Sequence, residues 1–257
     1  MPKHRVPAAR FDPIAPGAAG MPLYRAVKRS LLRAIEGGAC APGTALPSET
    51  ELAASFEVSI GTVRRAVDEL VLEHILVRRQ GLGTFVATHT ADRFLFQFFH
   101  VERTDGLRLA PTVEFISFDR IRCDDDTASA LGVRPGDPVI AVENRLLLQG
   151  KAVIHDRIAI SAGLFKGLTE KRFRERPGTI YQLYQTDFGI TVLRAVERAR
   201  ACLADRRLSR VLGLAAGAPV VQVRRTALTF GDKPIEYRVS TIDTERHDYV
   251  NQLSRPA

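Results

Sequence analysis

Apolar residues recur at helical spacing in three segments near the start of the chain. Pro22 opens the first segment, and a glycine pair closes it. The second segment begins at Ser48, which forms a capping-box pattern with Glu51, and the third runs from the capping residue Ser59 to Glu73. In the third segment the apolar residues fall at i, i+4, i+7 and i+8, namely Val63, Val67, Leu70 and Val71. The pattern therefore predicts three helices that pack together.

A short break separates the last two of these helices, and a glycine-tipped hairpin follows them. Residues 75–79 form a β run, 80–83 a flexible tip and 84–86 a returning strand. Two helices joined by such a break are typical of a helix-turn-helix, whose second helix enters the DNA major groove. The alternative is a helical pair and hairpin that serve only as packing. Basic residues on the unburied sides favour the DNA-binding interpretation: Arg64, Arg65, Arg78 and Arg79.

The second part of the chain alternates between apolar and polar residues with the period of β-strands. Strands are predicted over 112–122, 138–148, 151–161, 190–203, 219–230 and 233–242. Short helices are predicted over 125–131, 179–187 and 205–212, with glycines after the last two. The fold class is therefore α+β, with a helical domain followed by an antiparallel sheet.

Two segments of this second part repeat each other. The segments that begin at Leu131 and Leu212 align with Leu-Gly, Gly, Pro-Val, Gly and Arg recurring in the same order. Each copy comprises a helix end, a Gly-Pro turn and a β-hairpin. The repeat predicts a pseudo-symmetric antiparallel sheet with helices on one face and a small pocket between the halves.

Composition shifts divide the chain into three parts. Residues 1–20 lack periodicity and predict a disordered arm, which either reaches DNA or is only a solvated terminus. Residues 21–88 form the helical domain, and a polar stretch separates it from a second domain over 93–253. Four phenylalanines near the boundary belong either to the core of the second domain or to packing between domains: Phe94, Phe96, Phe98 and Phe99.

Charge and cysteine content narrow the possible partners and compartment. The 257 residues carry a formal charge of +8, which favours an anionic partner, although much of the excess lies outside the helical domain. The placement of individual arginines therefore supports DNA binding more than net charge does. Three distant cysteines predict no disulfide framework and fit a reducing cytoplasm. Without a membrane-length apolar run or a signal-peptide core, we expect a soluble, unsecreted protein.

Four motifs follow one another through the helical domain: PG-x-x-LPSE, EL-A, VS-x-x-TVR-A and QG-x-GTFV. Together they resemble the winged helix-turn-helix of the GntR family of bacterial transcription regulators. The resemblance implies that Ser59, Thr62 and Arg64 contact operator DNA. It further implies a wing tip at Gln80, Gly81 and Gly83. Arg65 joins this set by its position alone.

The chain departs from the family pattern at four positions. Thr50 stands where the family commonly has Arg, and Ile60 and Gly61 stand where Arg or a polar residue is frequent. These changes remove candidate hydrogen bonds to bases and leave apolar contact with thymine methyl groups. Glu57 replaces a usual Gly, at some cost if the turn is left-handed. We therefore expect an operator unlike those of better-known relatives.

The second domain resembles the UTRA effector-binding domain of the HutC subfamily, which is similar in fold to chorismate lyase. The resemblance implies effector contacts from Arg145, from His155 or Asp156, and from Glu236, with Tyr181 as a further candidate. Arg145 and Glu236 either hold an anion and an amine or hydroxyl of a ligand, or pair with each other across strands. Some relatives that bind sugar phosphates use a Tyr where Ile242 stands, which argues against a phosphosugar effector.

No catalytic, cofactor or metal site is indicated. Three adjacent carboxylates, Asp124 to Asp126, either bind a metal or cap the helix that follows, and capping is the usual role of such a run. The six histidines show no ligand spacing and no neighbouring nucleophile. We expect a homodimeric regulator, acting as a repressor, that binds an inverted-repeat operator and responds to a small effector, for which an anion is one candidate. The alternatives are a lyase-like enzyme with an attached DNA-binding module, and an architectural DNA binder without an effector.

Overall fold

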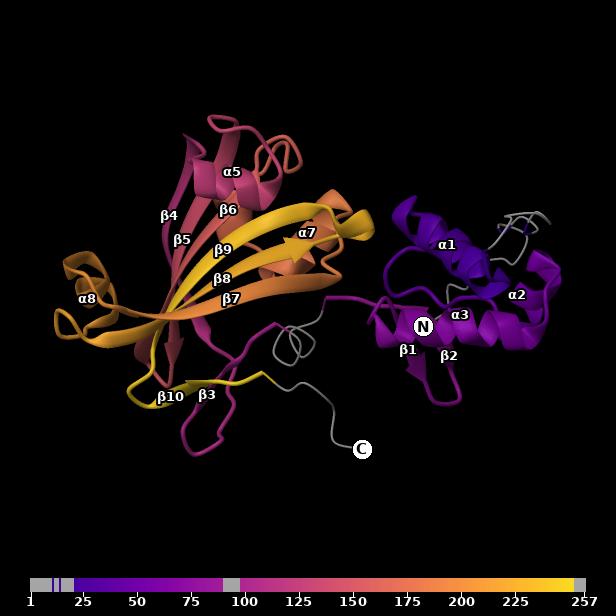
Figure 1. Ribbon diagram of the computed structural model, residues 1–257, viewed down its shortest axis with the longest axis horizontal. Coiled ribbons are helices and arrows are strands. Elements are labelled where there is room, and N and C mark those ends of the chain that lie inside the picture. Colours follow the sequence, from indigo (N-terminus) through magenta and orange to yellow (C-terminus); the bar gives the residue numbers. More distant parts are fainter. Residues whose placement is uncertain (1–10, 12–13, 15–20, 90–97, 252–257) are drawn as a thin grey trace. The chain divides into compact units, whose positions relative to one another are not determined.

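The computed structural model describes residues 11, 14, 21–89 and 98–251 (Figure 1). Contacts within the chain divide it into two units, residues 1–89 and 90–257.

Three helices form the body of the first unit. They are α1 Leu23–Glu36, α2 Glu49–Phe56 and α3 Ile60–Leu72. The capping box is confirmed: the Ser48 hydroxyl accepts a hydrogen bond from the Glu51 backbone at 3.2 Å, and the Ser48 backbone donates to the Glu51 carboxylate at 2.8 Å. Ser59 caps α3 in the same way, through the backbone N–H of Thr62. The buried side chains of α3 are Val63, Ala66, Val67 and Leu70.

The turn between α2 and α3 carries local backbone strain. Glu57 adopts φ 54° and ψ 43°, the left-handed conformation in which a side chain costs about 1 kcal/mol or more. The departure from the usual Gly at this position therefore has the expected structural consequence.

The predicted hairpin is confirmed as a two-stranded antiparallel wing. Strand β1 Leu76–Arg79 pairs with β2 Gly83–Val86, and the register places Arg79 opposite Gly83. Gly81 and Gly83 have φ values of 67° and 111°, so the tip depends on residues without a Cβ. An isolated bridge from Ala45 to Phe85 ties the wing to the segment before α2.

Part of the segment predicted as a disordered arm packs against the first unit. Phe11 is only 5% exposed, and its ring meets that of Phe56 edge to face at 5.4 Å. The Ile14 backbone also donates to the Phe56 carbonyl at 3.3 Å. The rest of residues 1–20 lies outside the described residues, as do Phe94 and Phe96.

A six-stranded antiparallel sheet organises the second unit, as predicted. Its order is β4-β5-β6-β9-β8-β7. The strands are β4 Thr112–Arg122, β5 Pro138–Leu148, β6 Lys151–Ser161, β7 Arg194–Leu203, β8 Pro219–Leu228 and β9 Pro234–Asp243. The predicted boundaries agree closely, except that β7 begins four residues later than the expected 190.

The sheet has the pseudo-symmetry that the sequence repeat predicts. Each half is a strand, a helix and a hairpin, and the halves meet where β6 pairs with β9. The two helices, α5 Asp125–Leu131 and α8 Arg206–Leu212, both begin at an aspartate cap and end at a left-handed glycine. Helix α5 packs against β9 and α8 against β6, so each helix contacts a strand of the other half.

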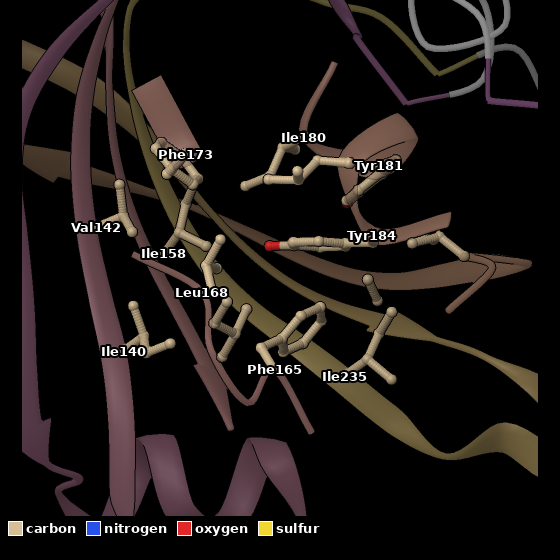
Figure 2. Close-up of a cluster of buried hydrophobic side chains, with 14 of the residues drawn as sticks. Ile140, Val142, Ile158, Phe165, Leu168, Phe173, Ile180, Tyr181, Tyr184 and Ile235 are labelled. Atoms are coloured by element: carbon tan, nitrogen blue, oxygen red, sulfur yellow. The ribbon is translucent and has the colours of Figure 1, made fainter. Parts of the chain in front are cut away.

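Helices cover both faces of the sheet, which corrects the expectation of one covered face. Side chains of β5 alternate between the two: Val139 packs with α5, whereas Ile140 and Val142 face the other side. That other side carries α6 Glu170–Arg174 and α7 Ile180–Phe188. Figure 2 shows Phe173, Ile180, Tyr181 and Tyr184 from these helices packed over sheet residues, and we call this side the α7 face.

Helix α6 and two short strands were not predicted. Strand β3 Val101–Arg103 pairs with β10 His247–Tyr249 beside the main sheet. Phe98 and Phe99, just before β3, are both buried in core clusters of the second unit. For these two phenylalanines the core interpretation is therefore confirmed.

Candidate functional sites

The exposed surface of the first unit gathers the residues predicted to contact DNA. Ser59, Arg64 and Arg65 are exposed at the start of α3, and Thr62 is half-buried beside them. The Ser59 and Thr62 hydroxyl groups hydrogen-bond each other at 2.8 Å. The Arg65 guanidinium lies 4.0 Å from the centre of the Tyr24 ring, a cation–π contact that ties Arg65 to α1.

One carboxylate connects α3 with the wing. Glu49, at the first turn of α2, accepts from Arg64 Nε at 2.8 Å and from Arg78 Nη2 at 2.9 Å. Arg78 also pairs with Asp68 of α3 at 2.5 Å. The side chain of Arg64 remains 61% exposed in this arrangement. Its guanidinium is therefore oriented by Glu49 but accessible to a phosphate or a base edge.

The wing tip is fully exposed. Gln80, Gly81 and Gly83 lie at the end of the hairpin, and no heavy atom of the described residues stands within 4 Å of a Cβ built on either glycine. Arg79, next to the tip, rests on the Phe85 ring at 4.6 Å. Recognition helix and wing thus present basic side chains and accessible backbone, the groups that contact DNA phosphates and bases.

The second unit buries a network of charges on the α7 face. Arg238 donates to both oxygens of Glu236, at 3.0 and 3.3 Å, and to Asp156 at 3.0 Å. Asp156 also accepts from the Ser240 hydroxyl at 2.6 Å. Glu236 is completely buried, and Asp156 and Arg238 are 2% and 5% exposed. Burial lowers the pKa of the Arg238 guanidinium, but the Glu236 and Asp156 carboxylates outweigh burial and raise that pKa above its ordinary value, so Arg238 stays charged.

Two tyrosines of α7 complete the coordination of Glu236. The hydroxyl groups of Tyr181 and Tyr184 donate to its two oxygens at 3.1 and 2.7 Å. Burial raises the pKa of both hydroxyls, and the nearby Glu236 carboxylate raises them further, so both remain protonated donors. The Phe98 ring meets Tyr181 edge to face at 4.9 Å. The carboxylate of Glu236 is therefore occupied by partners from its own unit.

A cavity of about 240 Å³ opens beside this network. Its polar side chains include Asn144, Asp156, Arg176 and Arg238. Asn144 is 4% exposed, and its Oδ1 has no hydrogen-bond partner among the described residues. The rest of the wall is largely apolar: Ala110, Pro111, Val113, Leu146, Ile158 and Ile180. An apolar cavity with a few convergent polar groups is the usual form of a small-molecule site.

The structure brings together three of the five residues proposed for the effector. Asp156, Tyr181 and Glu236 belong to the α7 face, with Asp156 lining the cavity and the other two behind it. Arg145 and His155 lie on the opposite face, because adjacent residues of a strand point to opposite sides.

On that opposite face both residues have partners of their own. Arg145 forms an ion pair with Glu114 and donates to the Val211 carbonyl at 3.3 Å. His155 Nε2 lies 3.4 Å from Glu143 Oε2, and Glu143 also pairs with Arg207. Burial lowers the pKa of His155, with Glu143 opposing this effect. The alternative that Arg145 pairs with Glu236 is therefore wrong, since each has another partner.

Sequence reasoning missed Arg238, Asn144 and Arg176. Two signals were available. Arg238 stands two residues after Glu236 on the same strand, and Asn144 is the register partner of Asp156 on β5 and β6, so both share a face with a proposed residue. Arg176 lies in the connection before α7, where periodicity carries no information.

Among the described residues, no group of three or more His, Cys, Asp or Glu side chains is placed to hold a metal ion. Asp124 instead caps α5, accepting from the Thr127 backbone at 2.8 Å. None of the described helices has the length and apolar character needed to cross a membrane.

A winged helix-turn-helix joined to a sheet domain with a ligand-sized cavity defines a class of protein, the ligand-responsive transcription regulator. Comparison with known families agrees with that class. The description "UTRA domain" matches residues 106–248, and "Bacterial regulatory proteins, gntR family" matches residues 23–86. The chain therefore belongs to the GntR family of regulators, in its HutC type with a UTRA domain.

Named relatives extend over most of the chain. The HTH-type transcriptional repressor NagR of Bacillus subtilis strain 168 is 26% identical, covering 91% of this chain and 96% of that protein. The histidine utilization repressor of Pseudomonas putida is 28% identical, covering 93% and 95%. A crystal structure of the ligand-binding domain of a GntR-family regulator from Bordetella bronchiseptica is similar with a TM-score of 0.58 and 26% identity, over 62% of this chain and 99% of that one. These relatives are named as transcription regulators and not as enzymes, which rejects the alternative of a lyase-like enzyme with an attached DNA-binding module.

Proposed function

We propose that the chain is a transcriptional repressor that binds an inverted-repeat operator as a homodimer and responds to a small-molecule effector. The observation that carries this proposal is the division of labour between the units. The first unit exposes its basic side chains on a recognition helix and a wing, and the second buries its charges around a cavity. Such a protein works where the DNA is, in the cytoplasm.

The first unit reads the operator through two elements. Arg64 and Arg65 reach phosphates and base edges from α3, and Ser59 and Thr62 approach the backbone at its start. The wing tip, formed by Gln80, Gly81 and Gly83, brings its backbone close to a phosphate or the minor groove. Ile60 is 42% exposed beside these residues and contributes apolar contact with thymine methyl groups.

A homodimer follows from the small footprint of one recognition helix. A single helix contacts only a few base pairs, and a twofold-related pair doubles the contact and reads an inverted repeat. The relatives NagR of Bacillus subtilis and the Pseudomonas putida protein are named repressors, which supports repression as the sign of regulation.

The effector occupies the cavity on the α7 face. Asp156 contacts it directly, and Glu236 and Tyr181 hold Arg238 in position behind it. Arg145 and His155 lie on the opposite face of β5 and β6, so they affect the effector only through the strands that also carry the cavity wall. Ligand binding shifts the dimer between arrangements that favour and disfavour the operator, which requires that the ligand bind one arrangement more tightly.

The test measures the mass of the complex that the full chain forms with a DNA duplex carrying a selected operator. Sedimentation should give two chains per duplex, and a screen of metabolites should contain compounds that change operator affinity. One chain per duplex would refute the homodimer. A screen in which no compound changes affinity would favour the architectural DNA binder.

A further inference from the structure

Phe11 and Ile14 anchor the chain ahead of α1 to the end of α2. Phe11 is 5% exposed, and its ring meets the Phe56 ring edge to face at 5.4 Å. The Ile14 N–H donates to the Phe56 carbonyl at 3.3 Å. Phe56 is the last residue of α2, where backbone carbonyls lack partners within the helix itself. The ring contact and the hydrogen bond therefore fix the point from which the chain continues toward its first ten residues.

This anchor lies at the end of the first unit where α3 begins. Phe56 stands three residues before the cap of α3. Tyr24 of α1 contacts Arg65 of α3. One turn later Lys28 of α1 pairs with Glu69 of α3 at 2.8 Å, so the two helices run in the same direction. The anchor and the start of α1 are therefore both beside the first two turns of α3.

The first ten residues contain basic but no acidic side chains. We call residues 1–10 the basic segment, and its basic side chains are Lys3, His4, Arg5 and Arg10. Two acidic residues, Asp12 and Glu57, are neighbours of the anchor residues, so the run of positive charge begins at Arg10. An extended chain of ten residues spans up to about 35 Å, the length of about ten base pairs. The basic segment is therefore long enough to follow the DNA backbone past the bases that α3 contacts.

We propose that the basic segment binds the DNA phosphates that flank each half-site, outside the contacts of α3 and the wing. The inference rests on the proposed function for the position of α3 on the DNA. Each Lys or Arg that meets a phosphate releases a condensed counterion, which favours binding. A basic segment ahead of a helical DNA reader contacts the groove beside the recognition helix in homeodomains. The anchor at Phe56 keeps the segment next to the DNA, so less conformational entropy is lost when it binds.

The test compares two duplexes that carry a selected operator. One duplex has ten extra base pairs on each side, and the other ends at the operator itself. Fluorescence anisotropy at a series of salt concentrations gives the Kd of the full chain and its variants for each duplex. The segment variant is Lys3→Gln/Arg5→Gln/Arg10→Gln, and the anchor variant is Phe11→Ala. The charge control changes three other exposed arginines, as Arg33→Gln/Arg134→Gln/Arg206→Gln.

The full chain should bind the long duplex about tenfold or more tightly than the short one, and the segment variant should bind both equally. On the long duplex the slope of log K against log salt should become shallower by about 2–3 per chain, since each lost phosphate contact removes about 0.9. The anchor variant keeps every charge but no longer holds the segment beside α3, so it should lose part of the preference for the long duplex. The charge control should keep that preference.

Two results would overturn the inference. One is equal affinity of the full chain for the two duplexes, and the other is an equal loss of affinity in the segment variant and the charge control. An unchanged preference in a folded Phe11→Ala protein would refute the role of the anchor, and circular dichroism with the melting temperature establishes that each variant is folded. Selection that enriches no operator would overturn the proposed function as well. An enriched operator bound without preference for flanking DNA would overturn this inference alone, so the two failures are distinguishable.

Discussion

The two units place their charged side chains in opposite ways. In the first unit Arg64 and Arg78 share one carboxylate, Glu49, and their side chains are 61% and 44% exposed. In the second unit Arg238 pairs with two carboxylates, Glu236 and Asp156, and all three side chains are buried. Exposed pairs contribute little to stability, whereas breaking a buried pair leaves an uncompensated charge. The paired arginines of the first unit therefore stay accessible to a partner, whereas the buried pairs of the second unit hold the fold around its cavity.

The largest effect that this comparison predicts is on the stability of the second unit. Glu236→Ala leaves Arg238 without its main partner and strands the Tyr181 and Tyr184 hydroxyls. The free energy of unfolding should fall by about 3–5 kcal/mol, measured by urea denaturation followed by circular dichroism. Glu114→Ala, which removes the exposed partner of Arg145, is the control and should cost less than about 1 kcal/mol. Equal losses in the two variants would remove the distinction between buried and exposed pairs.

The second prediction concerns a change in operator affinity that leaves the stability of the protein unchanged. Arg64→Ala should lower operator affinity by about 1–3 kcal/mol, the range of one base or phosphate contact. The melting temperature should hardly change, because the side chain is 61% exposed. Fluorescence anisotropy with labelled operator gives the affinity. Arg33→Ala on the exposed side of α1 removes the same charge elsewhere, and if it weakened binding equally, Arg64 would act only through net charge.

A smaller effect tests the strained turn before the recognition helix. Glu57→Gly should stabilise the first unit by about 0.5–1 kcal/mol, because it relieves the left-handed strain at a smaller cost in backbone entropy. Thermal melting measures the change. Ala54→Gly, in the exposed interior of α2, should instead destabilise by about 1 kcal/mol. A destabilising Glu57→Gly would show that the side chain, not the backbone, matters at this turn.

The smallest effect is the pH dependence from His155. Burial lowers the pKa of His155 below its ordinary 6.5, so at mildly acidic pH the unfolded chain binds a proton that the folded chain excludes. Stability should therefore fall as the pH is lowered through 6.5, and His155→Gln should make this fall shallower. Urea denaturation at a series of pH values measures both. An identical pH profile in the variant would mean that His155 does not contribute to the dependence.

The sequence predicted most of the fold because its local signals were strong. Ser48, Ser59 and Asp124 are all caps in the structure, and β4, β5 and β6 have the predicted limits. Helix α6 and the strands β3 and β10 are five residues or shorter, too short for a period to appear. Fold class was thus accessible from caps and periodicity.

The candidate effector site was accessible only in part. The resemblance identified the strands that carry it, but His155 and Asp156 are neighbours that face opposite sides, and the family pattern did not choose between them. Arg238 and Asn144 become visible only when the register of β5, β6 and β9 is known. Burial of a charge depends on such nonlocal pairing, and no local pattern encodes it.

We propose above that the first unit reads a specific DNA sequence as one half of a twofold pair. Selection of bound DNA from a random pool by the full chain tests this proposal. We expect enrichment of an inverted repeat whose half-site centres lie about one helical turn apart, or a multiple of it. Enrichment of a single half-site, or no enrichment at all, would refute the twofold reading.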